Sequence, residues 1–378
     1  MREALFILGI VLILGLKLIP RLVSSTAKVR RLGYFTALCS ITSQHNVPER
    51  LLPLGLHRWA EKHRASLERY SKSLPVARKR HLSVVGRITG QPDARRYIDT
   101  AREMGLIISI GREWQNTKEG HIIARVPSAK DNVFKLSLAQ RFLLLRLLLE
   151  KDYFYLRALY ELIATKAPTN DSNEFRKQVE SSIDFLLARE RGAAKQQALR
   201  AAKRKLWEWH DSETYYRDHI RAPRLEWLLD LGLLIKWNQK VNYFALAPNS
   251  EKFFSASTFD ARWMTEWYSQ TFYDTFLDMF PRQTTTWNEK SEQDRTKLMR
   301  RYLAKAIEIF RPSRGLDKIS AWQFTNYVAC ILSTKRGIVT SHDDVERALV
   351  TLTAGASSYR YVKMTSGADL GYIVRKHS

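Results

Sequence analysis

The sequence predicts a mainly α fold with small β-hairpins, and three observations support this prediction. Of the 378 residues, 45% are hydrophobic, while Gly and Pro number only 16 and 11, which excludes a largely disordered or collagen-like chain. At about 100 to 200 residues per domain, this length predicts two to four domains. Several stretches repeat apolar residues at helical spacing, and three of them run directly into two short strand-like segments.

The charge balance limits the kinds of partner. Lys and Arg number 62 against 38 Asp and Glu, which gives a formal net charge of +24. This surplus favours a polyanionic partner, namely nucleic acid, anionic lipid or an acidic protein surface, and charge alone does not choose among them. The two cysteines, Cys39 and Cys330, lie far apart in the sequence. A Cys-rich zinc site and a disulfide scaffold are therefore excluded, and a reducing compartment is indicated.

The first 25 residues contain a candidate hydrophobic helix. Residues 4–16 have no polar side chain, and the apolar run extends to residue 23 if Lys17 and Arg21 reach the lipid headgroups. Basic residues follow this run, so the pattern favours an inner-membrane anchor at residues 4–23 with a cytoplasmic body over a secretory signal. A run this short is also typical of a buried core helix, and a misassigned start codon is a further interpretation.

A basic helical segment follows. Between residues 56 and 74, apolar side chains recur at helical spacing and leave Arg58, Lys62, Arg69 and Lys72 on the opposite side. A solvated helix face is the simplest interpretation of this pattern. A second basic run at residues 78–81 favours a binding surface instead.

A pattern of helix, glycine and hairpin then occurs three times. In the first copy a helix starts near Asp93, stops at Gly105 and leads into two strands, with a polar turn predicted at residues 116–120. In the second copy a helix stops at Gly232 and two strands follow. A third, weaker copy begins after Ser341 and continues to the end of the chain.

A helix that runs directly into a two-stranded hairpin resembles the second half of a winged helix-turn-helix domain. The resemblance implies tandem winged-helix domains plus helical inserts, with the last helix of a domain in the major groove of DNA and the hairpin against the backbone or minor groove. The expected segments are a hydrophobic helix at 1–25, a basic helical segment and first winged helix at 28–127, a second winged helix with a long basic helical insert at 136–250, a helical aromatic-rich segment at 257–316, and a third winged-helix-like unit at 317–378.

The cations of these helices and hairpins are the predicted nucleic-acid contacts. Arg95 and Arg102 share the outward stripe of the first helix if Ile98 and Ala101 turn inward. The insert is expected to form one long basic helix over residues 189–205, and the third copy, whose helix starts acidic, is expected to pack against protein. The candidate binding residues are Arg95, Arg96, Arg102, Arg112, Lys118, Arg200, Lys203, Arg204, Arg221, Arg224, Lys236 and Lys240.

A search for catalytic motifs gives little. The sequence has no Gly-rich phosphate-binding loop, no His-Glu-x-x-His zinc helix and no Gly-x-Ser-x-Gly elbow, although a nuclease site built from distant carboxylates stays open. Asp343, Asp344 and Glu346 are interpreted as the acidic first turn of a helix that Ser341 caps, rather than as metal ligands. We therefore expect no catalytic residue, cofactor or metal.

The sequence thus predicts a non-catalytic DNA-binding subunit of a larger prokaryotic DNA-handling assembly, such as one for antiviral defence, plasmid maintenance or DNA transfer. Its expected partners are double-stranded DNA and other protein subunits. Because neither of the two best helices offers an outward Asn or Gln, we expect backbone contacts to dominate and sequence preference to be weak. The alternative is a membrane-proximal protein-protein adaptor whose basic surface meets anionic lipid or acidic partners.

Overall fold

The protein is mainly helical with small sheets, which confirms the mainly α prediction. Among the helices that can be described, none is both long enough and apolar enough to cross a bilayer. The apolar run at residues 4–23, Lys240 and most of the aromatic-rich segment lie outside the described residues. The computed structural model describes residues 26–74, 86–165, 172–208, 216–238, 243–248, 250, 276, 285–310, 318–354, 359–364 and 371–375.

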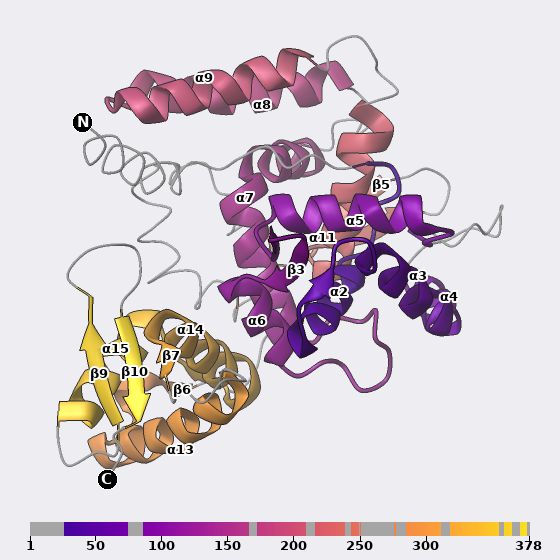
Figure 1. Ribbon diagram of the computed structural model, residues 1–378. Helices are drawn as coiled ribbons and strands as arrows, with labels where there is room; N and C mark the ends of the chain where they lie inside the picture. Colours follow the sequence, from indigo (N-terminus) through magenta and orange to yellow (C-terminus); the bar gives the residue numbers. More distant parts are fainter. Residues whose placement is uncertain are drawn as a thin grey trace, which may run out of the picture.

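The N-terminal unit, residues 26–125, packs helices against a three-stranded antiparallel sheet (Figure 1). The strands lie in the order β1-β3-β2, so the short strand after the first helix pairs with the last strand of the hairpin. The elements are α2 (Gly33–Gln44), β1 (Val47–Pro48), α3 (Leu52–Lys62), α4 (Arg64–Ser73), α5 (Gln91–Glu103), β2 (Ile107–Ile110), β3 (Glu113–Asn116) and α6 (Lys118–Arg125).

Local sequence signals explain the ends of α5 and of its hairpin. Gly105 has φ +75°, a left-handed conformation that stops the helix as predicted. The hairpin turn is at Gly111 and Arg112, both with positive φ, which is typical of a tight two-residue turn. The predicted turn at residues 116–120 is therefore wrong. The Thr117 side chain instead accepts a hydrogen bond from the Gly120 amide and caps the start of α6.

The middle unit, residues 138–246, contains a long helix, a helical pair, and a helix that leads into a hairpin. α8 and α9 lie side by side at one end of the molecule (Figure 1). The predicted single helix over residues 189–205 is wrong, because α8 ends at Arg189 and Gly192 separates it from α9. The elements are α7 (Leu138–Ala164), α8 (Ser172–Arg189), α9 (Ala193–Glu208), η1 (Tyr216–Arg221), α11 (Ala222–Leu231), β4 (Leu234–Asn238) and β5 (Tyr243–Leu246).

The C-terminal unit, residues 285–375, shares part of its topology with the N-terminal unit. In both, a helix, a short strand, further helices and a hairpin follow one another, and the short strand pairs with the second strand of the hairpin, here in the order β7-β10-β9. The C-terminal unit also contains a separate parallel pair of strands, β6 and β8. The predicted third helix and hairpin are confirmed. The elements are β6 (Thr285–Thr286), η4 (Trp287–Glu289), α13 (Glu292–Phe310), β7 (Lys318–Ser320), α14 (Ala321–Ile331), η5 (Leu332–Arg336), β8 (Ile338–Val339), α15 (His342–Ala354), β9 (Tyr359–Lys363) and β10 (Gly371–Arg375).

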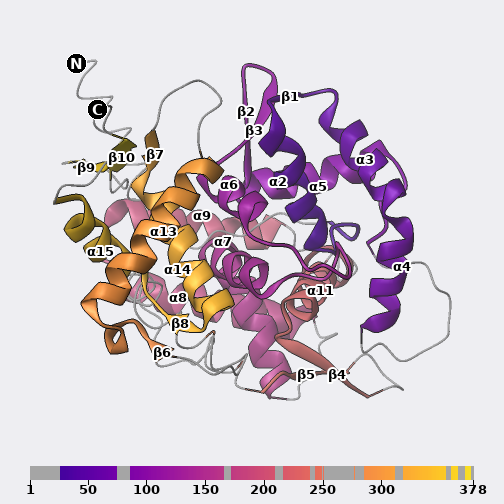
Figure 2. The ribbon, with the colours of Figure 1, turned by 90° about the horizontal axis from the view of Figure 1, so that it is seen from below.

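The three units share one continuous hydrophobic core. α14 of the C-terminal unit packs against α6 and α7, and α11 packs against α7. In Figure 2, α7 lies between the N-terminal unit and the C-terminal unit. This packing determines which faces of α5, α11 and α15, the helices before the three hairpins, are exposed.

Candidate nucleic-acid interface

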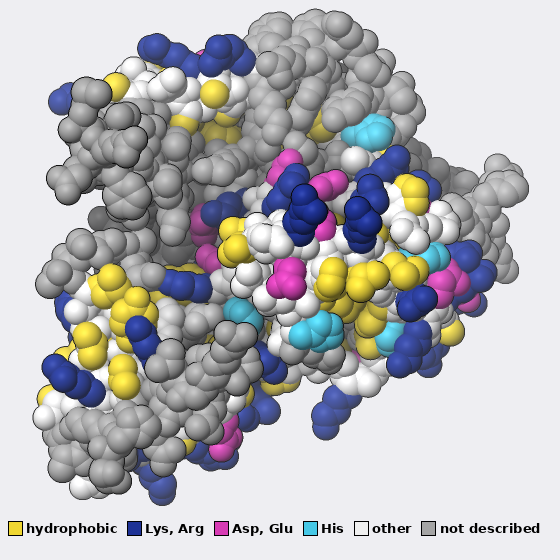
Figure 3. Space-filling model, viewed as in Figure 1, with side chains coloured by type: hydrophobic (Ala, Val, Ile, Leu, Met, Phe, Trp, Pro, Cys, Tyr) yellow, Lys and Arg dark blue, Asp and Glu magenta, His cyan; other side chains and the backbone are white. Residues whose placement is uncertain are grey.

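Helix α5 turns one side into the core and the other to solvent. Tyr97 and Ile98 are buried with their neighbours on the inner side. Arg95, Arg96 and Arg102 are exposed, as predicted from the helical periodicity. Figure 3 shows Lys and Arg side chains gathered over α5, on the near face of the molecule, and again near the end formed by α3 and α4. The structure therefore brings these three predicted residues together on one accessible helix face.

The arginines of α5 are held only weakly by neighbouring carboxylates. Arg96 lies 3.9 Å from Asp93, and Arg102 lies 3.5 Å from Asp99, with both arginines about half exposed. Exposed pairs of this kind contribute about 1 kcal/mol or less and exchange readily for another anion. Within the described part of the chain, no carboxylate lies within 4 Å of Arg95. All three guanidinium groups can therefore contact phosphates.

Asp93 anchors the start of α5. The Thr89 amide and hydroxyl donate hydrogen bonds to its carboxylate at 3.1 and 2.6 Å. Burial alone would raise the pKa of Asp93, but these hydrogen bonds and nearby cations hold it below its usual value. The charged carboxylate stabilises the N-terminal turn of the helix. One expectation needs correction here, because α5 begins with Gln91, which is exposed, and so does offer an outward amide.

Two cations were predicted on the hairpin beside α5, and one of them lies there. Arg112 lies exposed at its tip, in the turn described above. Lys118 was expected on this hairpin, but it is the first residue of α6 and is half-buried, so that prediction is wrong. The cause is the misplaced turn, because Thr117 starts a helix where a loop was expected.

Five exposed cations on α3 and α4 extend the basic character of the N-terminal unit. The apolar side chains of these helices, including Leu67 and Tyr70, point into the core. The sequence pattern had separated this basic side from the apolar side, yet these residues were left out of the candidate binding residues. They are Arg58, Lys62, Arg64, Arg69 and Lys72.

Helix α11 occupies the same place before a hairpin as α5, but it is buried. Arg224 is fully buried, and its guanidinium donates to both carboxylate oxygens of Asp152 at 2.6 and 2.9 Å. The same guanidinium lies 4.2 Å from the ring centre of Tyr155. Arg224 therefore cannot reach a nucleic acid, and its prediction as a binding residue is wrong. The sequence carried a signal for this, because α11 is apolar on nearly all sides, as buried helices are.

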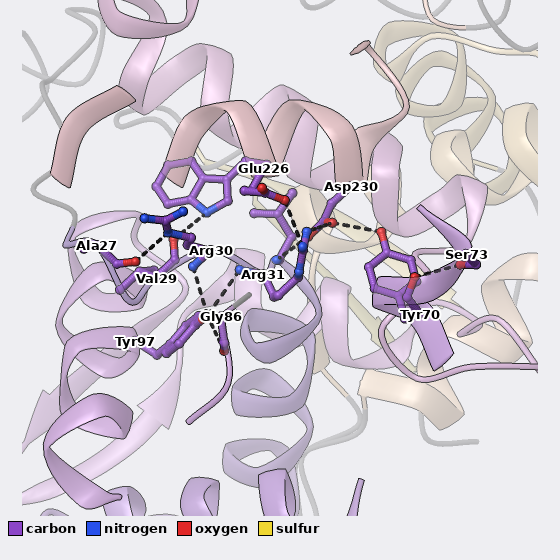
Figure 4. Close-up of polar contacts among 12 residues, drawn as sticks. Ala27, Val29, Arg30, Arg31, Tyr70, Ser73, Gly86, Tyr97, Glu226 and Asp230 are labelled. Atoms are coloured by element: carbon purple, nitrogen blue, oxygen red, sulfur yellow. Dashed lines mark hydrogen bonds and ion pairs between the residues drawn. The ribbon is translucent and has the colours of Figure 1, made fainter. Parts of the chain in front are cut away.

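A buried ion cluster fixes α11 against the N-terminal unit (Figure 4). The Arg31 guanidinium contacts Asp230 and Glu226, each at 2.8 Å. The Asp230 carboxylate also accepts hydrogen bonds from the Leu32 amide at 2.9 Å and the Tyr70 hydroxyl at 2.8 Å. Burial would lower the pKa of Arg31, but Asp230 and Glu226 more than offset this and raise it. Burial raises the pKa of Asp230 to about 6 against the opposing effect of Arg31.

The chain just before α2 connects this cluster to α5. The Tyr97 hydroxyl of α5 accepts hydrogen bonds from the amides of Arg30 and Arg31 at 3.0 and 3.2 Å. The Trp227 indole of α11 donates to the Val29 carbonyl at 2.9 Å. Helices α4, α5 and α11 thus meet around one buried segment. This contact holds the inner side of α5 and leaves its arginines facing outward.

The remaining predicted residues are spread over other surfaces. Arg200 and Arg204 are exposed on α9, which belongs to the α8–α9 pair rather than to the surface of α5 (Figure 1). Lys203 of the same helix contacts Asp184 of α8 at 2.7 and 2.8 Å. Arg221 is half-buried at the end of η1, and Lys236 is placed through its backbone in β4.

The start of α15 confirms that Ser341 caps the helix, with Asp344 as its partner. The Ser341 amide and hydroxyl donate to Asp344 at 3.0 and 2.8 Å, and the Asp344 amide donates back to the Ser341 hydroxyl at 3.1 Å. Arg347, an exposed arginine on this helix, lies 2.6 Å from Asp344. Glu346 accepts a hydrogen bond from the Tyr361 hydroxyl at 3.1 Å, and together with His342 and Asp343 it places ligand-type atoms within 4.8 Å of one another.

No protein-family model, curated protein or solved structure matches this chain.

Proposed function

We propose that the protein binds double-stranded DNA as a non-catalytic subunit, with α5 in the major groove and the β2–β3 hairpin against the backbone. The observation that carries this proposal is the exposed row of Arg95, Arg96 and Arg102 on a helix that leads straight into a hairpin. Cations on such a helix neutralise phosphates, which supply most of the affinity for DNA. On the inner side of α5, the hydrogen bonds from the Arg30 and Arg31 amides to the Tyr97 hydroxyl support a rigid, preorganised surface.

The proposal includes winged-helix domains for the N-terminal and C-terminal units. The support is their similar chain order and their shared strand order, in which the short strand after the first α-helix pairs with the last strand of the hairpin. The middle unit keeps the helix and hairpin but turns the helix inward. Among the described residues, the N-terminal unit combines this order with three exposed arginines on the helix before its hairpin, whereas α15 exposes one arginine, which pairs with Asp344 at 2.6 Å.

The predicted contacts favour recognition of the backbone with limited base readout. Arginine serves phosphate oxygens as readily as guanine edges. Gln91, at the first turn of α5, is a side chain that can pair with adenine. We therefore propose weak sequence preference, with any base selection confined to the N-terminal end of α5.

The experiment that tests this function measures binding of the full chain to labelled duplex DNA, single-stranded DNA and duplex RNA over a series of salt concentrations. Duplex DNA should bind most tightly, and its affinity should fall steeply with salt because bound phosphates release counterions. Failure to bind duplex DNA, or an affinity that does not change with salt, contradicts the proposal.

A matched pair of single substitutions sharpens this test. Arg95→Ala should reduce the slope of log affinity against log salt by about 0.9, the value for one lost phosphate contact. Arg300→Ala removes the same exposed charge from α13 and should leave the slope unchanged. Equal slopes for the two variants would mean that α5 does not contact the phosphates.

A further inference from the structure

The outer face of the C-terminal sheet carries exposed apolar side chains. In the register of the sheet, Val362 pairs with Tyr372, and Val374 lies between Arg360 and Lys318. Strand alternation places these side chains together on one face, while Ile373 and its neighbours point into the core from the other face. We call the outer surface the C-terminal sheet face, made of Lys318, Arg360, Val362, Met364, Tyr372 and Val374.

This face is apolar at its centre and positive at its margin. Val362 is 37% exposed and Met364 is 39% exposed. Figure 3 shows hydrophobic side chains gathered over this sheet with Lys and Arg side chains beside them. Among the described residues of the face, the charged ones are Lys318 and Arg360, so both its charges are positive. Exposed apolar side chains clustered inside a polar margin mark an interaction surface.

The aromatic ring on this face is already occupied. The Lys318 ammonium lies 3.7 Å from the ring centre of Tyr372, a cation–π contact. A base of single-stranded nucleic acid would need that ring face for stacking. The accessible apolar side chains, Val362 and Met364, are aliphatic and suit the side chains of a protein.

The outer side of the neighbouring helix α15 is less basic and more apolar than the outer side of α5. Its exposed arginine, Arg347, is bound to Asp344, and Val350 is 45% exposed on its outer side. Self-association through this face would bring Lys318 and Arg360 close to their own copies, which like charges disfavour. A partner that carries negative charges beside apolar side chains can pair with these cations and cover the apolar centre of the face.

We propose that the C-terminal sheet face binds an acidic protein segment that also presents apolar side chains. Carboxylates of the segment pair with Lys318 and Arg360, while its apolar side chains cover Val362 and Met364. The surface is separate from α5, so the protein can hold DNA and a protein partner at once.

The test uses two labelled peptides and the full chain. In one peptide glutamates alternate with leucines, and in the other serines replace the leucines. The first should bind the wild type by fluorescence anisotropy at least about tenfold more tightly than the second. Val362→Glu/Met364→Glu should weaken binding of the first peptide by about tenfold or more. Ile108→Glu/Ile110→Glu, which makes the same change at exposed positions of the N-terminal hairpin, should leave it unchanged.

Circular dichroism and thermal unfolding of both double variants establish that they are folded. A milder double variant, Lys318→Gln/Arg360→Gln, leaves the apolar side chains in place and should also weaken binding of the first peptide. Equal losses of peptide affinity in the two glutamate variants would overturn the proposal, because the N-terminal hairpin would then contribute as much to peptide binding as the C-terminal sheet face. The proposal would also be overturned if Val362→Glu/Met364→Glu left binding of the first peptide unchanged but abolished binding to single-stranded DNA or to anionic vesicles.

Discussion

The N-terminal and C-terminal units share a topology but present different surfaces. In both units a helix, a short strand, further helices and a hairpin follow one another, and the short strand pairs with the last strand of the hairpin. Helix α5 of the first unit exposes Arg95, Arg96 and Arg102, whereas α15 exposes Val350 and an arginine that pairs with Asp344. The same chain order therefore presents a more basic outer surface before the hairpin in one unit than in the other.

In the middle unit, the helix before the hairpin is placed in a third way. Helix α11 also runs into a hairpin, but Arg224 and Asp230 on it are used in buried ion pairs. Basic residues before a hairpin thus face solvent in one unit and form buried ion pairs in another. Substitutions in the two helices should separate these roles.

The largest effect is expected for Arg224→Ala. The substitution removes the guanidinium that donates to both oxygens of the buried Asp152 carboxylate, and breaking a buried pair in this way costs about 3 to 5 kcal/mol of the free energy of unfolding. Chemical denaturation measures this, with exposed Arg200→Ala as the control that should change it by about 0.5 kcal/mol or less. At a temperature where Arg224→Ala is folded, its DNA affinity should match the wild type. A selective loss of DNA affinity would place α11 at the interface after all.

The next effect concerns the pH dependence of stability at Asp230. Its pKa in the folded protein is about 6, above the value of about 3.9 for an unfolded Asp. The folded state therefore binds a proton more tightly, so the stability from this group is fully present below pH 4 and is lost as pH rises through 6.

Asp230→Asn removes this titration. The free energy of unfolding of the wild type minus that of the variant should fall by about 1 to 3 kcal/mol between pH 4 and pH 7. Denaturation at a series of pH values measures the difference. A difference that grows with pH would show that the carboxylate is stabilised in its charged form instead.

Substitutions in the α8–α9 pair test how far the proposed DNA-binding surface extends. Arg200→Glu/Arg204→Glu should weaken binding of unrelated duplexes by about three- to tenfold, because exposed phosphate contacts carry no base identity. Arg300→Glu/Arg301→Glu on α13 makes the same charge change and should have a smaller effect. Similar losses for both pairs would remove α9 from the interface.

The smallest effect is expected for Gln91→Ala at the start of α5. Loss of an amide that can pair with adenine should alter affinity by about threefold or less on duplexes that contain a preferred adenine, and not on others. Arg102→Ala should instead weaken all duplexes of one length alike. A loss for Arg102→Ala confined to one guanine-containing site would indicate a sequence-specific regulator.

Local features of the fold were predictable from the sequence. Gly105 and Gly232 ended their helices, Ser341 capped α15, and the apolar spacing of α5 identified its exposed arginines. Each of these depends on residues within one or two helical turns. Gly111 gave an equally local signal for the hairpin turn, but the polar run after it was interpreted as the turn instead.

Long-range packing was not predictable in the same way. Arg31 lies 199 positions from Asp230, and nothing near either residue indicates that they pair. The pairing of β1 with β3 likewise joins two-residue and four-residue strands that are too short to stand out in a sequence. Arg224 resembled a surface cation because its partner, Asp152, belongs to another helix.

The most direct test of the central claim compares charge reversal on two helices. Arg95→Glu/Arg96→Glu/Arg102→Glu changes α5, and Lys297→Glu/Arg300→Glu/Arg301→Glu makes the same charge change on the exposed side of α13. Affinity for a labelled duplex is measured by fluorescence anisotropy at physiological salt. We expect the α5 variant to lose at least about thirtyfold in affinity and the α13 variant to lose about threefold or less. Equal losses for the two variants would contradict the proposed role of α5, because the affinity for DNA would then depend on the overall charge of the protein.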